Sequence, residues 1–309
     1  MKLPPLWDPA LDALAPETRA FNAKLPKEGM PARWTPEAIA KARDLSQVMG
    51  GVFTARKIAG FEERTIPGAV GPIRLRVFVP PQVRAVYLDI HGGGFFMGAP
   101  EMSDAANASL AKHAGVATVA TSYRLAPEHP YPAGPDDCEA AALWLLANAK
   151  REFGTERLLI GGGSAGANLA AVTLLRLRDR HDAARAFSAA NLVFGVYDVS
   201  GTPSQLRQGM AGFRDLYLPG LDTAARKHPD ISPLYADLAG LPPALFTVGT
   251  ADYLYDDSLF MAMRWRAAGN EAELAVYPDC VHGFTAFPTQ LSRAANARIN
   301  AWIAAHVGS

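Results

Sequence analysis

The most constraining feature of the sequence is an apolar run that leads into clustered glycines with one serine among them, at residues 158–170. An Ala/Leu-rich helical pattern follows, so the stretch predicts a strand, a tight turn and a helix, with Ser164 at the corner. Gly162, Ser164 and Gly166 fit G-x-S-x-G, a sharp turn that lifts a serine hydroxyl above the carboxyl edge of a sheet. Glycine is favoured there because a side chain beside the strained serine would collide with the neighbouring strand or helix.

This stretch alone leaves three interpretations open. Gly161, Gly163 and Gly166 also fit the dinucleotide fingerprint G-x-G-x-x-G. The next expected strand ends in Asp198, which could bind a ribose hydroxyl. The third interpretation is a glycine-rich turn with an incidental serine. The remainder of the chain has to decide among them.

The pattern of elements along the chain favours an α/β fold. Strands are expected at residues 61–66, 73–79, 84–90, 116–122, 157–160, 187–197, 244–248 and 272–277. Helices are expected at residues 35–48, 103–113, 136–153, 164–180, 255–268 and 289–306. The first two strands resemble an antiparallel hairpin at a sheet edge. The later alternation predicts a mainly parallel sheet with helices on both faces and its active site at the carboxyl ends of the strands.

Two segments interrupt this alternation and are interpreted as a cap. Residues 1–50 are rich in proline and hold large apolar side chains that either pin the segment to the body or line a lid, namely Leu6, Trp7, Phe21 and Trp34. Residues 198–230 have the pattern of short helices. We therefore expect an N-terminal cap segment at 1–50, a cap insertion at 198–230, and a catalytic core of residues 51–197 and 231–309.

Composition excludes several classes of protein. The net charge is +0 and no cluster of Lys and Arg appears, so nucleic acid is not an expected partner. Cys138 and Cys280 are far apart and suggest buried thiols, and the histidines lack the spacing of metal ligands. The N-terminus has no signal-peptide pattern and no run of about 18 apolar residues occurs, so a cytoplasmic protein without a membrane span is expected.

Residues suited to acyl transfer follow four of the expected strands. These are His91-Gly92-Gly93-Gly94, Ser164, Asp252 and His282. Acyl transfer needs an attacking hydroxyl, an imidazole that takes its proton, a carboxylate that orients the imidazole, and N–H groups that hold the oxyanion. The order Ser, Asp, His is that of α/β-hydrolases. The dinucleotide interpretation explains neither the glycine run after His91 nor His282.

The combined motifs resemble the hormone-sensitive-lipase-like branch of α/β-hydrolase carboxylesterases, from about residue 55 to the C-terminus. The residues that carry the resemblance are His91-Gly92-Gly93-Gly94, residues 123–128 (Tyr-Arg-Leu-Ala-Pro-Glu), residues 162–166, Asp252 and His282-Gly283-Phe284. The resemblance implies an eight-stranded α/β-hydrolase sheet, a helical cap, and cofactor-free hydrolysis of small-molecule carboxylic esters.

By position, the resemblance makes Ser164 the nucleophile, His282 the general base and Asp252 the acid that orients it. The oxyanion would be held by the backbone N–H groups of Gly93, Gly94 and Ala165. His91 would shape its own loop, and the same loop would be pinned by Tyr123, Arg124 and Glu128. A closed apolar pocket for short to medium acyl chains is expected from Phe95, Phe96, Phe213 and Tyr217.

Two positions depart from the family pattern. Gly163 stands where an acid usually precedes the serine, and we expect altered support or pH behaviour of the site with activity kept. Asp252-Tyr253-Leu254 stands where Asp-Pro-Leu is usual, which leaves Asp256 as an alternative acid. Amide or carbamate hydrolysis on the same residues and a non-catalytic small-ligand receptor of the same fold also stay open. The final strand, if it lies at a sheet edge, could pair with a second copy to form a homodimer.

Overall fold

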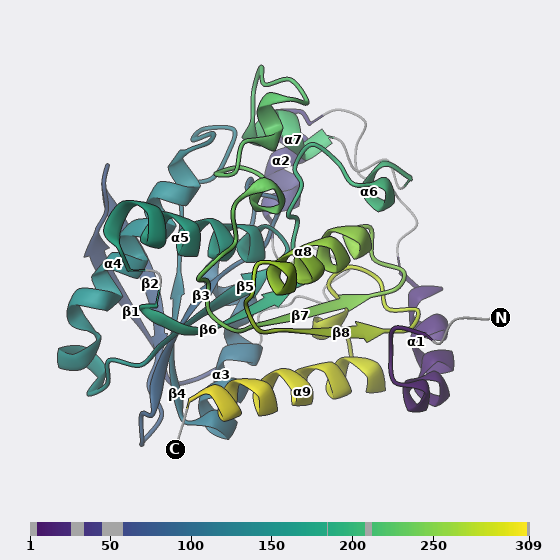
Figure 1. Cartoon of the computed structure of the whole chain (residues 1–309), viewed down its shortest axis with the longest axis horizontal. Helices are drawn as coiled ribbons and strands as arrows, with labels where there is room; N and C mark the ends of the chain where they lie inside the picture. The colour runs from purple at the N-terminus through teal and green to yellow at the C-terminus, as the bar shows by residue number, and fades with distance from the viewer. Residues whose placement is uncertain (1–4, 26–33, 45–57, 184, 208–211, 308–309) are drawn as a thin grey trace.

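The computed structural model describes residues 5–25, 34–44, 58–183, 185–207 and 212–307, which form an α/β fold around one eight-stranded sheet (Figure 1). The strand order across the sheet is β1-β2-β4-β3-β5-β6-β7-β8. The strands are β1 (Phe61–Pro67), β2 (Pro72–Phe78), β3 (Ala85–Ile90), β4 (Val116–Thr121), β5 (Leu158–Gly163), β6 (Phe187–Val193), β7 (Ala244–Gly249) and β8 (Ala272–Tyr277). The pairs β1–β2 and β2–β4 are antiparallel and all others are parallel, which confirms the expected edge hairpin and the predicted fold class.

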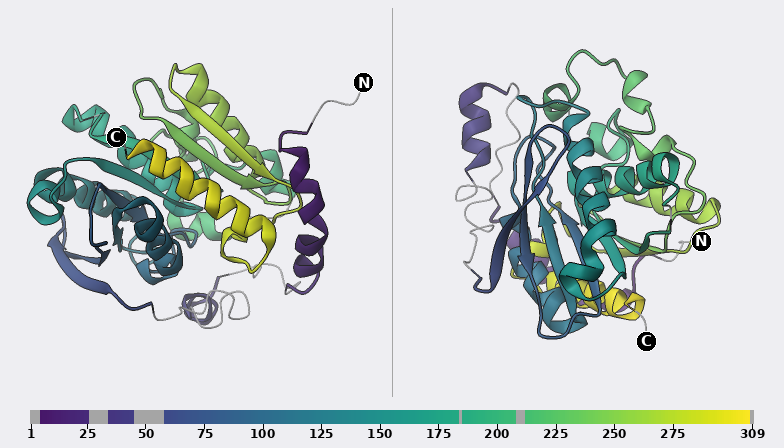
Figure 2. Two further views of the ribbon diagram at one scale, coloured as in Figure 1. Left: turned by 90° about the horizontal axis from the view of Figure 1, so that it is seen from below. Right: turned by 90° about the vertical axis from the view of Figure 1, so that its left-hand side faces the viewer.

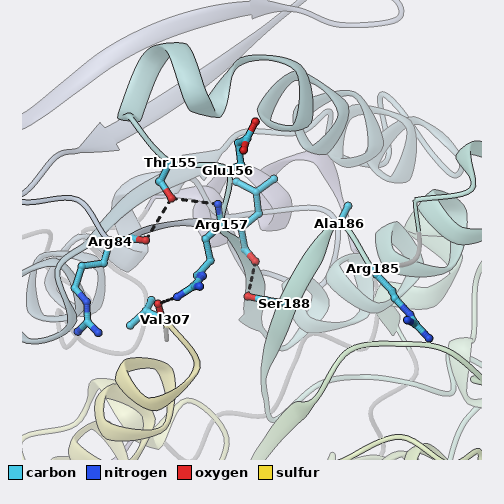
Figure 3. Close-up of a pocket in the computed structure, with 9 residues that line it drawn as sticks. Arg84, Thr155, Glu156, Arg157, Arg185, Ala186, Ser188 and Val307 are labelled. Atoms are coloured by element: carbon cyan, nitrogen blue, oxygen red, sulfur yellow. Dashed lines mark hydrogen bonds between the residues drawn. The ribbon is translucent and has the colours of Figure 1, made fainter. Parts of the chain in front are cut away.

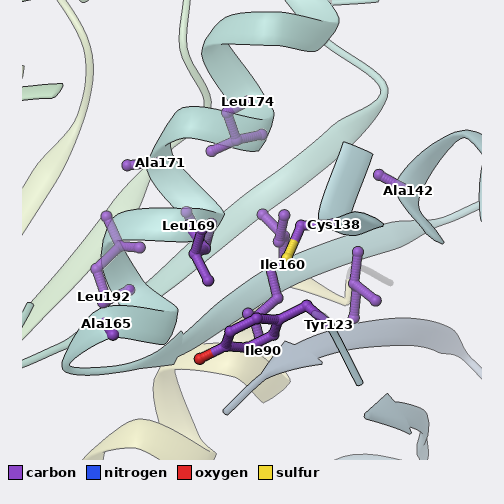
Figure 4. Close-up of a cluster of buried hydrophobic side chains, with 14 of the residues drawn as sticks. Ile90, Tyr123, Cys138, Ala142, Ile160, Ala165, Leu169, Ala171, Leu174 and Leu192 are labelled. Atoms are coloured by element: carbon purple, nitrogen blue, oxygen red, sulfur yellow. The ribbon is translucent and has the colours of Figure 1, made fainter. Parts of the chain in front are cut away.

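Helices cover both faces of the sheet (Figures 1 and 2). One face is covered by α3 (Asp104–Ala114) and α9 (Gln290–His306), and the other by α4 (Ala133–Phe153), α5 (Ala165–His181) and α8 (Tyr255–Ala267). The first thirteen residues of α5 are buried and its last turn is exposed, as its apolar start and basic end predict. Apolar side chains of α4, α5 and the central strands pack together there, including Ile90, Ile160 and Leu169 (Figure 4).

Burial of the strands explains their composition. Every residue of β3, β4 and β7 is buried, as expected for strands covered on both faces, and most of these residues are apolar. The thiols Cys138 and Cys280 are buried and unbonded, as predicted. No helix within the described ranges is both long and apolar enough to span a membrane.

Two predicted boundaries are wrong by four residues or more. β6 ends at Val193 and not at residue 197, because the chain turns at Phe194, where φ is +36°. Beyond the turn, the N–H groups of Tyr197 and Asp198 donate to the Asp257 carboxylate and not to a neighbouring strand. The helix expected at 35–48 corresponds to α2 (Pro36–Arg43), which ends before the predicted residue. Residues 45–48 lie outside the described residues. The start of α2 agrees with the prediction, since the Thr35 hydroxyl accepts from Ala38 N–H.

The described parts of residues 1–50 dock at two separate places. A short 3₁₀ helix (Pro9–Leu14) and α1 (Ala15–Asn22) lie against α9, and Phe21 contacts Phe287 with ring centroids 4.9 Å apart (Figure 2). In the second piece Trp34 contacts Phe96 at 4.5 Å. Phe21 and Trp34 therefore anchor the segment to the body of the protein, as expected. Leu6 is 58% exposed, so the expectation was wrong for this residue.

The 198–230 insertion contains the two short helices α6 (Pro203–Arg207) and α7 (Gly212–Tyr217) in its described part, above the sheet in Figure 1. The division of the chain into an N-terminal cap segment, a cap insertion and a core stays a prediction. β8 lies at the sheet edge opposite β1, and pairing of that edge with a second copy likewise stays a prediction.

Candidate active site

Ser164 lies at a strained corner between β5 and α5. Its backbone angles, φ +58° and ψ −120°, are rare for a residue with a side chain. The turn depends on close backbone approach, because a Cβ atom would come within 2.2 Å of the Ile90 carbonyl oxygen at Gly162 and within 1.9 Å at Gly166. The serine is thereby lifted to the carboxyl edge of the sheet, where its side chain is partly accessible.

The loops after β7 and β8 are joined to each other. A Cβ atom at Gly249 would lie 2.0 Å from the Cys280 carbonyl oxygen, so glycine allows the two loops to meet. The N–H of Ala251 donates to that carbonyl at 3.1 Å, and the N–H of Asp279 donates to the Thr250 hydroxyl at 2.8 Å. These contacts fix Asp252 and His282 on adjoining loops.

The structure brings Ser164, His282 and Asp252 together in one row. Nε2 of His282 is 3.0 Å from Oγ of Ser164, and its Nδ1 is 3.0 Å from each carboxylate oxygen of Asp252. The Asp252 side chain is fully buried, and one of its oxygens also accepts from the N–H of Leu254 at 2.8 Å. Because an ionised carboxylate only accepts, Nδ1 carries the proton and Nε2 is left to accept from the serine.

The alternative acid, Asp256, does not reach the imidazole. One of its carboxylate oxygens accepts from the N–H of Ser204 at 2.8 Å, and the same oxygen faces Arg207 at 3.8 Å. Asp198 was expected at a strand end but lies in the loop after β6, where it accepts from the Ser200 N–H and the Tyr235 hydroxyl. Neither carboxylate has a bond to His282 within the described part of the chain.

The glycine run after β3 lies beside the serine. Gly93 and Gly94 adopt φ angles of +118° and +59°, which glycine tolerates without a steric penalty. A Cβ atom at Gly92 would lie 3.3 Å from Cβ of Ser164, so the loop backbone borders the nucleophile. Within the described residues no protein group accepts from the N–H groups of Gly93, Gly94 or Ala165, which leaves these donors available to a substrate oxygen.

The loop that carries these glycines is supported as the sequence predicts. His91 is buried, donates from Nδ1 to the Gly92 carbonyl at 2.8 Å, and stacks on Tyr123 with ring centroids 4.3 Å apart. Burial lowers the pKa of His91 to about 4, so its ring is neutral near pH 7. The Arg124 guanidinium pairs with Asp137, and Glu128 accepts two bonds from Arg43 of α2.

Three of the four predicted pocket residues, Phe95, Phe213 and Tyr217, form a buried aromatic cluster where the glycine loop meets α7. Phe95 stacks on Tyr217 with centroids 4.0 Å apart and planes 5° from parallel, and Phe213 lies 6.5 Å from Phe95. Phe96 is fully buried against Trp34. All four side chains are at most 4% exposed, so their packing is established while contact with a substrate stays a prediction.

Two aromatic neighbours of His282 could not be predicted from the sequence. The ring of Phe194 lies 4.8 Å from the imidazole at 64°, and that of Tyr253 lies 4.5 Å away at 39°. The hydrophobic pattern predicts Phe194 inside a strand, and Tyr253 stands out only as a departure from a family motif. The one signal in the sequence was an aromatic residue directly after the presumed acid.

A separate cavity of about 600 Å³ opens at the amino ends of β3, β5 and β6, away from the carboxyl ends that carry the site (Figure 3). Its lining includes Arg84, Arg157 and Arg185, and Arg157 donates to the Val307 carbonyl. Because Ser164 follows the carboxyl end of β5, this cavity lies across the sheet from the row of Ser164, His282 and Asp252 and has no part in it.

Comparison with known proteins agrees with the geometry. A family model described as alpha/beta hydrolase fold matches residues 87–286. Carboxylesterase NlhH of Mycobacterium tuberculosis is 36% identical over 76% of this chain and 79% of its own, and an ethyl acetate hydrolase of Pseudomonas putida is 31% identical over 71% and 73%. An esterase structure from Pyrobaculum calidifontis superimposes with a TM-score of 0.79 at 31% identity, covering 86% of this chain and 92% of that one. The chain therefore belongs to the hormone-sensitive-lipase-like family of α/β-hydrolase serine carboxylesterases.

Proposed function

We propose that this carboxylic ester hydrolase cleaves short- to medium-chain esters through an acyl-enzyme on Ser164, with His282 as general base and Asp252 as its orienting acid. The observation that carries the proposal is the unbroken row of contacts from the serine hydroxyl through both imidazole nitrogens to a buried carboxylate. That arrangement matches what a weak hydroxyl nucleophile needs in order to be activated.

The proposed reaction has two halves. His282 takes the proton of Ser164 while the serine oxygen attacks the ester carbonyl carbon, and it then gives the proton to the departing alcohol oxygen. Water, deprotonated by the same imidazole, attacks the acyl carbon; the bond from that carbon to the serine oxygen then breaks, and the imidazolium returns the proton to the serine as the acid leaves. In both halves the carbonyl oxygen becomes an oxyanion that the Gly93, Gly94 and Ala165 N–H groups would bind, and removing one such donor costs about 3–4 kcal/mol of barrier.

The nucleophile is tested by Ser164→Ala. We expect ester turnover to fall by at least about 10³-fold with little change in the melting temperature, because the hydroxyl is the attacking group and supports no packing. A Ser200→Ala variant is a matched control, since Ser200 lies in a turn beyond β6 and its hydroxyl donates to Asp198, outside the row. Undiminished turnover in the Ser164 variant would refute the assignment.

Acyl-chain preference is tested by a series of p-nitrophenyl esters of increasing length. The buried aromatic cluster beside Gly94 supports a small acyl site, because a Cβ atom at Gly94 would already lie 3.0 Å from Phe96 and 3.7 Å from Phe213. The name of the ethyl acetate hydrolase also points to a short ester. We expect kcat/KM to peak at short or medium chains, whereas a peak at long chains with activation at an oil–water interface would contradict the proposal.

Two rival functions are separated by simple measurements. An amide or carbamate hydrolase would cleave an anilide or carbamate as fast as the ester with the same acyl group, and we expect the ester to be much faster. A receptor of the same fold would bind a ligand without covalent reaction. We expect a fluorophosphonate probe to label the wild-type chain, which a receptor would not allow.

A further inference from the structure

The orientation of His282 depends on more than its two polar partners. Bonds from Nδ1 and Nε2 fix the imidazole only while both exist, and the bond to Ser164 is lost whenever the serine is acylated. In that state the ring still has to present Nε2 to the incoming water. Something other than the nucleophile must then keep the ring in place, because a misplacement of about 1 Å can cost about a hundredfold in rate.

Two aromatic rings contact the imidazole directly. Tyr253 follows the orienting acid in the chain, and its ring centroid lies 4.5 Å from that of His282. Phe194 approaches from the loop after β6 at 4.8 Å in an edge-on arrangement. Aromatic rings at such distances attract one another, and a ring face also attracts the imidazolium that forms during turnover.

The backbone at Phe194 indicates that its place beside the histidine is enforced. Its φ of +36° is unfavourable for an aromatic residue, and its N–H donates to the Thr247 carbonyl of β7 at 2.7 Å. The space for the ring exists because Gly163 has no side chain, since a Cβ atom there would lie 3.2 Å from Cε2 of Phe194. Strain of this kind persists only where the surroundings hold it, and it gathers at functional sites.

The phenol of Tyr253 is neutral at the site. Burial raises its pKa, and the charge of Asp252 acts in the same direction. Both departures from the family pattern thus adjoin aromatic side chains at the site, Tyr253 itself and Phe194 beside Gly163.

Building on the proposed function, we propose that the rings of Tyr253 and Phe194 are positioning groups that hold the His282 imidazole in its working orientation, including when the serine is acylated. The contribution of Tyr253 comes from its ring, which contacts the imidazole. Loss of either ring should therefore lower kcat more than it changes KM, because substrate binding groups are untouched.

The test compares Tyr253→Leu, Phe194→Leu and Tyr253→Phe with Tyr255→Leu in the full chain, using p-nitrophenyl butyrate. Tyr255 is a matched control, because the same change two residues away removes a ring that has no contact with His282. We expect the first two variants to lose about tenfold or more in kcat and Tyr253→Phe to recover most of that loss. We expect Tyr255→Leu to keep wild-type kcat.

A second readout separates positioning from general destabilisation. The proton on Nδ1 of His282, held by Asp252, should give a far-downfield proton NMR signal in the wild type. We expect that signal to broaden or vanish in Tyr253→Leu and Phe194→Leu and to persist in Tyr255→Leu at matched melting temperatures. The proposal is overturned if Tyr253→Leu keeps the kcat of the control, if Tyr253→Phe is as slow as Tyr253→Leu, or if kcat falls with the signal unchanged. Failure of the proposed function would appear separately, as a wild-type chain that a fluorophosphonate does not label.

Discussion

At the scale of single residues, the geometry of the nucleophile depends on atoms that are absent. Gly162 and Gly166 allow the Ile90 carbonyl to touch the turn, and their missing Cβ atoms make the serine corner possible. The pattern G-x-S-x-G predicted this requirement from the sequence alone. The sequence could not identify Ile90 as the contact, because that neighbour is set by strand register and not by the motif.

Gly166→Ala should therefore be severely destabilising. Its Cβ atom would lie 1.9 Å from a backbone oxygen that cannot move without shifting β3, so we expect a loss of at least ~3 kcal/mol in the free energy of unfolding. Gly71→Ala is the control, since a Cβ atom there has no neighbour within 4 Å, and its effect should stay within ~0.5 kcal/mol. Urea denaturation of both variants measures the difference, and equal stability of the two would contradict the contact.

A buried carboxyl on β3 predicts a pH effect. Burial raises the pKa of Asp89 from its ordinary 3.8 to about 6, although the Asn107 amide donates a hydrogen bond to it. Between these two values the folded state binds more protons than the unfolded state, so this group lowers stability as pH rises from about 4 to about 6 and changes nothing further above that. Asp89→Asn should gain stability relative to wild type over that window, as measured by denaturation at pH 4, 5, 6 and 7. A constant difference across the series would contradict the burial effect.

At the scale of elements, hydrophobic patterning predicted every strand of the sheet and the five helices that cover it. The predicted end of β6 was wrong because it depends on a long-range partner. β6 stops early because the N–H groups beyond it bond to Asp257, a side chain sixty residues further along the chain from Tyr197. No local pattern carries that information. For the same reason, the sequence predicts Phe194 inside the strand and gives no sign of its contact with His282.

One buried guanidinium on α5 joins that helix to α4 and to the loop that carries Asp230. Arg176 is 3% exposed and pairs with Asp136 at 2.8 Å, with Glu139 at 3.0 Å and with Asp230 at 2.6 Å. Its removal would leave carboxylates in a partly buried place without their main counter-charge. Buried pairs broken in this way are strongly destabilising.

We therefore expect Arg176→Met to lower the free energy of unfolding by about 3–5 kcal/mol. Arg298→Met removes an exposed pair with Glu273 and should change it by less than ~1 kcal/mol. Thermal and chemical denaturation of both variants check the contrast. Equal small losses would show that the buried cluster contributes no more than a surface pair.

At the scale of the whole molecule, the site is assembled by the topology of the sheet. The loops after β3, β5, β7 and β8 come from positions spread over nearly two hundred residues, and parallel strands bring their carboxyl ends to one edge. The order of motifs along the sequence predicted this convergence and the row of Ser164, His282 and Asp252. The sequence did not predict the docking of α1 and α2 at two separate places, because both depend on individual contacts such as Phe21 with Phe287.

The central claim is that these loops form a working row of hydroxyl, imidazole and carboxylate, and active-site labelling tests it most directly. The intact chain, Ser164→Ala and His282→Ala are treated with a fluorophosphonate, and the adduct is located by peptide mass analysis. We expect one adduct, on Ser164, that is absent from the first variant and forms far more slowly in the second. An adduct on another residue, or ester hydrolysis that continues in an unlabelled chain, would contradict the account.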